Sequence, residues 1–359
     1  MIPEYISIQV PGAMYEGFEK VQVGFGIDQA TRDFSIEMTE RPGQWAFPPG
    51  TPIEIRANAD LLVKGYVNKY DSSGDSKTHR VTIMGRGKGQ DIVDCSCVHD
   101  TGHFENQKTD QALQALDKFG VGIRAKVPIE KIPMHHIKPG ETVFQFGERY
   151  LRPQGITMMG MADGSIDLTN ASVAERMAGA LIEGGNIQRF RVSFDDGSKF
   201  SSQFVKGQGR VGLGKNAMKV KEKSDDNTVK RYRPRITVAE GDTDPKRAKG
   251  RADHEKERAA GEAVSGEITV PGFRDAAGQI WKANALVYVH SPILMHLSRT
   301  MLIKAVRLEQ DNGKGTGSQA RLTLVDPQAF KGKGGGASAG GKQTDAAWNF
   351  DSSGGSAAP

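Results

Sequence analysis

The chain has 359 residues, of which 37% are hydrophobic and 7% aromatic, and its formal net charge is +5. This length favours two to four domains, and the small positive excess permits contact with nucleic acid or an acidic protein without requiring either. No stretch approaches the ~18 apolar residues of a membrane span, and the first residues lack a secretory signal pattern, so we expect a protein that is not exported by that route.

Residues 1–97 carry short alternating apolar patterns, which are typical of half-buried β-strands. About six such patterns occur, at residues 6–10, 21–25, 34–38, 53–55, 63–67 and 81–84. Because the strands are short and closely spaced, they predict a small antiparallel barrel or sandwich.

The pattern changes near residue 107, and residues 98–178 predict a small α+β domain. Thr109 is expected to cap a helix that ends at Gly120. A second helix starts at Thr142, where Gln145 three residues later completes a capping box. Strand-like pieces at 123–127 and 156–168 lie between and after these helices.

Strands return near residue 181, so 179–242 and 262–330 predict a second β region. Its strand patterns lie at 190–194, 200–205, 236–238, 268–270, 280, 287–289, 301–308 and 320–325. A charged connecting helix over 243–261 starts at Asp244-Pro245, and we expect it to stop at Gly261. Its faces are charged or alanine, which leaves two alternatives: exposure to solvent or close packing through the alanines at 248, 252 and 259.

A glycine-rich run from Gly207 to Asn216 contains G-x-G-x-x-G and nearly matches a phosphate-binding loop. Glycines in such loops let backbone N–H groups approach phosphate oxygens. Asn216 stands where a hydroxyl would hold magnesium, and the next residues do not predict the helix that must follow. We interpret the run as a flexible loop, and nucleotide binding is the less favoured alternative.

Four residues with zinc-ligating side chains fall within nine positions: Cys95, Cys97, His99 and His103. One residue between the cysteines would place them on opposite faces of a strand, whereas structural zinc sites use C-x₂₋₄-C spacing. Two cysteines are also too few for a disulfide scaffold, so we expect reduced thiols and assembly in a cytoplasm.

His135-His136, in a proline-bounded loop, is interpreted as solvated. No nucleophile elbow or distinctive acid pair occurs. The sequence therefore predicts no catalytic residue, no metal site and no cofactor.

Residues 206–235 are irregular in pattern and basic, with ten Lys/Arg against three Asp/Glu. Only one aromatic residue, Tyr232, is interleaved with the basic residues after the glycine-rich run, so stacking platforms for nucleic acid are scarce. A solvated loop or a protein contact is therefore favoured. The basic residues that we name as candidates for an interface or channel are Lys219, Lys221, Lys223, Arg231 and Arg233.

Five stretches of the chain carry a family resemblance: 85–96, 204–208, 231–241, 279–284 and 322–330. In the expected order over about residues 5–330, they resemble the baseplate hub proteins of Mu-like contractile-tailed phages, in the late control D/VgrG-like hub superfamily. Residues 137–150 also resemble a LysM motif, which in other proteins helps to form a peptidoglycan-binding surface. None of the stretches is a catalytic signature, so the resemblance rests on their order and coverage.

The resemblance implies a mainly β fold with an α+β insert: two related β-barrel domains plus a small LysM-like domain. It implies a non-enzymatic homotrimeric ring in the virion tail baseplate that joins the tail tube protein to the trimeric spike and adapts sixfold to threefold symmetry. Tape measure and wedge proteins are further expected partners, and DNA passes only in transit. The alternative is a peptidoglycan-binding or cell-wall-degrading tail protein.

Residues 331–359 consist mainly of Gly, Ser, Ala and Lys, and we expect this tail to be disordered in isolation. Its aromatic residues, Trp348 and Phe350, are isolated within this polar composition. Isolated aromatic residues in disordered segments often serve as docking points, so we predict that these two anchor the tail on a neighbouring protein.

Overall fold

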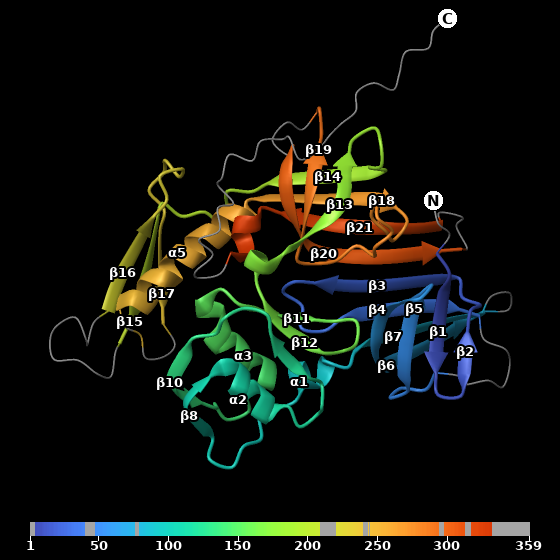
Figure 1. Cartoon of the computed structure of the whole chain (residues 1–359), viewed down its shortest axis with the longest axis horizontal. Coiled ribbons are helices and arrows are strands. Elements are labelled where there is room, and N and C mark those ends of the chain that lie inside the picture. The colour runs from blue at the N-terminus through green and yellow to red at the C-terminus, as the bar shows by residue number, and fades with distance from the viewer. Residues whose placement is uncertain are drawn as a thin grey trace, which may run out of the picture.

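The computed structural model describes residues 4–39, 47–75, 79–208, 220–239, 243, 245–293, 298–312 and 317–331. Within these ranges the fold is mainly β, as the sequence predicted, with a helical insert and one long helix at the periphery (Figure 1).

The N-terminal β region contains seven strands: β1 (Ile6–Val10), β2 (Ala13–Tyr15), β3 (Lys20–Gly26), β4 (Asp33–Met38), β5 (Pro52–Ala57), β6 (Asp60–Gly74) and β7 (His79–Gly87). They pair in the order β3-β4-β7-β6-β5-β1-β2, and every pair is antiparallel. Buried and less buried residues alternate along β1 and β4, which is the pattern that predicted these strands.

The C-terminal β region contains six strands: β13 (Glu175–Ile182), β14 (Arg189–Phe194), β18 (Val264–Pro271), β19 (Ala285–His290), β20 (Arg299–Asp311) and β21 (Gly317–Val325). The strand order is β14-β18-β21-β20, and β19 connects β13 to the first half of β20. A bulge between Ile303 and Ala305 lies where the partner of β20 changes from β19 to β3.

The two β regions share one thirteen-stranded sheet and one hydrophobic core. Strands β3 and β20 pair antiparallel from Lys20↔Asp311 to Gly26↔Ala305. Ile36 of the first region and Leu322 of the second belong to the same buried cluster. Two separate barrel domains are therefore not confirmed, because pairing and packing both continue across the junction.

The insert between the β regions is built from α1 (Gln90–Asp94), β8 (His103–Lys108), α2 (Thr109–Leu116), β9 (Ile123–Ala125), β10 (Lys131–His136), α3 (Val143–Leu151), η1 (Arg152–Gln154), β11 (Thr157–Gly160), β12 (Ile166–Thr169) and η2 (Ala171–Val173). It has its own buried cluster around Leu113 and Phe146. The predicted capping box is confirmed, since Thr142 Oγ1 accepts from the Gln145 backbone N–H at 3.2 Å.

A small three-stranded sheet lies at the left of Figure 1. It contains β15 (Ser202–Gly207), β16 (Val220–Asp225) and β17 (Pro234–Val238), with β15 in the middle. Helix α5 (Pro245–Glu262) covers one face and also contacts the short helix η4 (Pro327–Phe330). The predicted alternative of close packing through alanines is confirmed for Ala248 and Ala252, which are buried against Val205 and Val220.

Two predicted helix boundaries are wrong. Helix α2 ends at Leu116 rather than Gly120, because the Asp117 carboxylate accepts backbone N–H groups from Val121 and Gly122 and forms a turn. Helix α5 continues through Gly261, where the Ala329 backbone packs so closely that a Cβ would lie 2.3 Å from its nitrogen.

Two strand predictions also need correction. Residues 206–235 are not irregular throughout, because they contain β16, which pairs with β15 over six residue pairs. Ile280 forms only an isolated bridge to Arg274, since the Asp275 carboxylate accepts from Ala277 and Gln279 and holds a tight turn there.

Candidate functional site

The small sheet has one covered face and one exposed face. Thr237 of β17 and Ser224 of β16 donate to Glu255 and Asp253 of α5, at 2.9 and 2.6 Å. Residues one position away point to the other side because strand side chains alternate. We call that side the outer face; it consists of Phe204, Lys206, Lys221, Lys223, Asp225, Ile236 and Val238.

The outer face combines exposed apolar side chains with lysines. Ile236 is 57% exposed and Val238 is 67% exposed. Phe204, in the central strand, is the register partner of both Lys223 and Ile236. The Nζ atoms of Lys221 and Lys223 lie 5.1 and 5.6 Å from the Phe204 ring centroid. This arrangement suits an apolar partner that also carries negative charge.

The structure brings together only part of the predicted basic set. Lys221 and Lys223 lie on the outer face, where Lys223 forms a 2.8 Å ion pair with Asp225. The hydrogen bond from Lys223 lowers the pKa of Asp225. Arg233 instead donates to the carbonyls of Asp196 and Gly197, so it holds a turn. Arg231 is exposed in the loop before β17.

Other predicted residues lie outside the described ranges: Lys219, Trp348, Phe350 and the part of the glycine-rich run from Gly209 to Asn216. Their roles therefore stay predictions. A second aromatic platform nearby, Phe200, was missed by the sequence reading. Its ring lies 5.3 and 5.2 Å from the Arg233 and Arg235 guanidinium carbons.

The cysteine–histidine cluster does not converge on a metal. Within the described residues, no three His, Cys, Asp or Glu side chains gather as metal ligands would. Cys95 follows α1 as its C-cap rather than lying in a strand. Burial, aided by Glu141, raises the pKa of the Cys97 thiol to about 11, so the thiol stays protonated at neutral pH.

The prediction that both histidines of the pair are solvated is wrong for His135. It lies in β10 and is fully buried, with Nε2 3.1 Å from Thr109 Oγ1 and its ring centroid 4.6 Å from that of Tyr150. Burial lowers the pKa of His135 to about 4. Thr109 is thus a partner of His135 rather than the predicted N-cap, which is Lys108.

The segment that resembles a LysM motif is held by a buried ion pair. Arg149 Nε and Nη2 donate to the two carboxylate oxygens of Glu141 at 2.8 and 2.6 Å. Arg149 also donates to the His136 carbonyl at 2.6 Å and lies 4.5 Å from the Tyr150 ring centroid. Arg149 and Glu141 are therefore engaged in holding the insert together.

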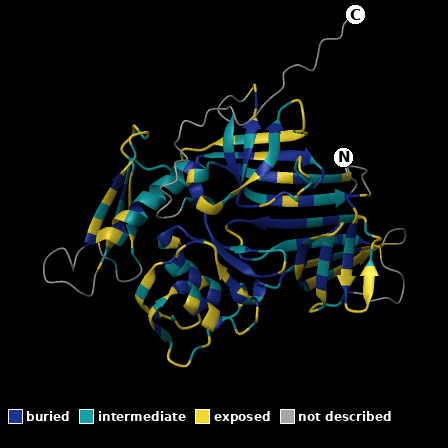
Figure 2. Ribbon diagram, in the orientation of Figure 1, coloured by how far each residue is buried: buried dark blue, intermediate teal, exposed yellow. Residues whose placement is uncertain are grey.

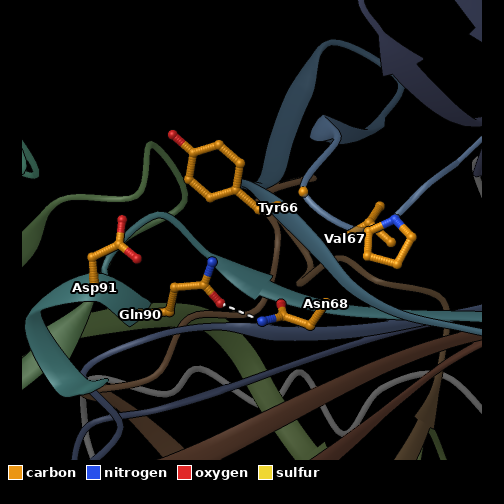
Figure 3. A pocket seen from close by; sticks show the side chains of 7 residues that line it. Tyr66, Val67, Asn68, Gln90 and Asp91 are labelled. Atoms are coloured by element: carbon orange, nitrogen blue, oxygen red, sulfur yellow. Dashed lines mark hydrogen bonds between the residues drawn. The ribbon is translucent and has the colours of Figure 1, made fainter. Parts of the chain in front are cut away.

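A hollow of about 410 Å³ lies where β6 meets α1, lined by Tyr66, Asn68, Gln90 and Asp91 among others (Figure 3). Asn68 Nδ2 donates to Gln90 Oε1 at 2.8 Å, and Asn68 Oδ1 accepts from the Arg86 backbone N–H. Because both the nitrogen and the oxygen of the Asn68 amide are hydrogen-bonded within the protein, the hollow is better explained as a contact between β6, β7 and α1 than as a ligand site.

Strands at the ends of the large sheet present further candidate surfaces. Among the described residues, β14 and β2 are the terminal strands of the main order, and each pairs on one side. β14 exposes Phe190 and Phe194, of which Phe194 is 55% exposed. β2 exposes Met14, at 63%. A strand with an unpaired edge can accept a strand from another chain.

Family comparisons match most of the chain in three blocks, which are separated by residues 171–243 between the second and the third. Residues 5–87 match the Mu phage baseplate assembly protein GpP-like N-terminal domain, and 89–170 match the second domain of baseplate hub protein gp44-like proteins. Residues 244–333 match the fourth domain of Mu phage baseplate assembly protein GpP. Baseplate hub protein gp44 of Escherichia phage Mu is 24% identical over 339 residues, covering 90% of this chain and 88% of that protein.

Solved structures agree with these matches. The 43 kDa tail protein of prophage MuSo2 from Shewanella oneidensis superposes with a TM-score of 0.82 at 27% identity, covering 91% of this chain and 100% of that one. A tail protein from Neisseria meningitidis MC58 shares the fold, with a TM-score of 0.80, 18% identity, and coverage of 92% and 98%. None of the helices in the described ranges has the length and apolar composition needed to cross a bilayer. The chain belongs to the family of baseplate hub proteins of Mu-like phage tails.

Proposed function

We propose that three copies of this chain form a non-enzymatic ring that joins the tail tube to the trimeric spike and adapts sixfold to threefold symmetry. The ring is assembled in the host cytoplasm and is incorporated into the virion tail. Tape measure and wedge proteins are further contacts, and DNA passes through the channel only in transit.

The junction between β3 and β20 is the observation that carries this proposal. In the order β18-β21-β20-β3-β4-β7, the antiparallel pair β20–β21 and a third strand, β18, lie on one side of the junction. The antiparallel pair β3–β4 and a third strand, β7, lie on the other side. Two similarly built β regions thus stand side by side in each chain, as a six-part ring of three chains requires. Closed rings form when one surface of a subunit matches a different surface of the next.

The two β regions are also fixed relative to each other. Lys20 and Glu309 form a 3.0 Å ion pair across the junction, and Lys304 and Asp28 form another at 3.1 Å. Arg274 of the second region binds Glu4 at 3.0 Å, and Glu4 is 2% exposed at its side chain. Two β regions joined by these contacts can act as one rigid third of a ring. Strands β2 and β14 then lie at the outer ends, where neighbouring chains can bind.

Native mass measurement of the purified protein, alone and with its spike, tests the ring. We expect trimers, with a population that rises with concentration. Phe194→Glu and Met14→Glu place charge at the two sheet ends and are expected to lower the trimer fraction. Val173→Glu, at a residue that is 44% exposed outside the large sheet, is the matched control. A protein that stays monomeric beside every tail component would contradict the proposal.

The LysM-like resemblance leaves a peptidoglycan-binding or cell-wall-degrading protein as the alternative. The Arg149–Glu141 pair favours a scaffold role, because it uses the polar groups of the segment internally. Pulldown on purified peptidoglycan and a zymogram separate the alternatives. We expect neither binding nor clearing, and either result would favour the alternative.

A further inference from the structure

The outer face of the small sheet has no cover among the described residues. Ile236 and Val238 project from the edge strand β17 with more than half of their surface exposed. Figure 2 shows exposed residues alternating with less exposed ones along β16, whereas most residues of β17 are exposed, and α5 lies on one side of the sheet. A thin sheet with one apolar face left open is a docking surface rather than a finished core.

The charge of the outer face limits what can dock there. Three lysines, Lys206, Lys221 and Lys223, stand against one carboxylate, Asp225. Lys221 and Lys223 lie over the Phe204 ring, so an occupant that places an aromatic group near Phe204 also brings its flanking residues close to ammonium groups. The chemistry therefore fits a short segment with aromatic and acidic side chains.

Such a segment exists in this chain, within residues 343–352. It contains Trp348 and Phe350 between Asp345 and Asp351, and it has no lysine or arginine. The aromatic residues are two positions apart, so in an extended backbone both would point to the same side. Two carboxylates then match the lysine excess of the outer face.

The tail also starts close to the small sheet. Lys331, the last described residue, has its carbonyl 3.2 Å from Nδ1 of His254, in the middle of α5. The preceding Phe330 is buried, with the Arg258 guanidinium 5.8 Å from its ring centroid. Residues 332–359 therefore begin next to α5, the helix that covers one face of the small sheet.

The linker length is sufficient to reach the outer face. Trp348 follows Lys331 by seventeen residues, which can span up to ~56 Å when extended. A helix with its side chains is about 10–12 Å across, so passing one helix and one sheet takes on the order of 25 Å. A glycine-rich linker of this length gives an effective concentration on the order of mM, which favours docking within one chain.

We propose that residues 343–352 dock on the outer face of the same chain, with Trp348 and Phe350 packed against Phe204, Ile236 and Val238. Asp345 and Asp351 lie against the lysines of that face. The segment thus covers the sheet face opposite α5, and the proposal does not depend on ring formation.

Photo-cross-linking of the full chain tests this placement. Trp348→p-benzoylphenylalanine puts the reactive group at the proposed contact, and peptide mass spectrometry after irradiation identifies its neighbours. Chains of light and heavy isotope composition, mixed in equal amounts, distinguish contacts within a chain from contacts between chains. We expect cross-links within one chain to peptides that contain Phe204 or Ile236. Cross-links only between light and heavy chains, only to an added tail protein, or to other surfaces would overturn the proposal.

Substitutions on the outer face sharpen the test. Val238→Glu is expected to lower the cross-link yield at least fivefold, whereas Val173→Glu, also at an exposed valine, leaves it unchanged. Lys221→Glu with Lys223→Glu should also lower the yield, and adding Asp345→Lys with Asp351→Lys should restore it. A cross-link yield that stays the same in Val238→Glu and in the double lysine variant would contradict docking at this face. Light scattering on the same samples reports ring formation separately, so the two proposals can fail independently.

Discussion

The insert and the small sheet are both small units that pack helices against strands, but only the insert is closed. In the insert, Phe146 is fully buried and has its ring against Phe104, His135 and Tyr150. The small sheet has a core of four buried apolar residues, two from its strands and two from α5, and an opposite face with exposed Ile236 and Val238. The closed unit is suited to holding its own shape, and the open unit is suited to binding something else.

Two residues of the same chemical type, one in the insert and one on the small sheet, are expected to affect different properties of the protein. Arg149 and Lys223 are both cations that lie over aromatic rings and pair with carboxylates. Arg149 is enclosed and bidentate, whereas Lys223 is exposed. The first kind of pair affects folding and the second affects binding.

Removing the central ring of the insert should have the largest effect. Phe146→Ala is expected to cost about 3–5 kcal/mol, because the side chain is fully buried and leaves a cavity. Hydrogen exchange of α3 amides in the full chain measures the loss within the insert. Phe194→Ala, at an exposed phenylalanine of β14, should leave that exchange unchanged. Equal effects at the two positions would mean that the insert is not a closed core.

Acid should weaken the insert through His135. Its pKa is about 4 in the folded protein against an ordinary 6.5, so between these values the unfolded chain binds more protons. The free energy of unfolding of the insert should therefore fall by about 2–3 kcal/mol as the pH drops from 6.5 to 4. Chemical denaturation with His135→Gln should show a smaller pH dependence in this window. His136→Gln, at the exposed neighbour, should retain the full dependence.

Disrupting the buried Arg149–Glu141 ion pair should reduce stability less than removing the Phe146 ring but more than disrupting a surface ion pair. Glu141→Gln leaves the Arg149 charge without its counterion and is expected to destabilise by about 2–3 kcal/mol. Glu148→Gln removes the partner of Arg152, whose side chain is 66% exposed, and should cost at most about 0.5 kcal/mol. Denaturation midpoints of both variants test the ranking, and a reversed order would contradict the assignment.

Most strands of the large sheet and the α3 capping box could be predicted because their signals are local, whereas β2 and β13 were not predicted. The burial of His135 could not, since its hydroxyl partner Thr109 is 26 residues away in the sequence. β16 was missed for a related reason. Its α5-facing positions, apart from Val220, are polar, and Ser224 reaches Asp253 instead of an apolar core. Strands covered by alanine and carboxylate lack the apolar alternation that a sequence reading detects.

The candidate site shows the same limit. The sequence marks Lys221 and Lys223 as basic, but only the register of β15, β16 and β17 places them with Phe204, Ile236 and Val238 on one face. Arg233 has the same charge and lies nearby in sequence, yet it holds the carbonyls of a turn. Charge can be read from composition, whereas the face that a charge occupies depends on pairing between distant strands.

The smallest expected effect on stability is also the most informative for the open face. In a chain that ends at Lys331, and therefore lacks the proposed docking segment, Val238→Glu should change the free energy of unfolding by no more than about 0.5 kcal/mol, because the side chain is 67% exposed. Ala252→Leu, on the α5 side of the same small sheet, should cost about 1–3 kcal/mol by overpacking. Thermal denaturation of the two variants compares the covered and open faces directly. If Val238→Glu destabilised this shortened chain as much as Ala252→Leu, a part of the folded core other than residues 343–352 would occupy the outer face.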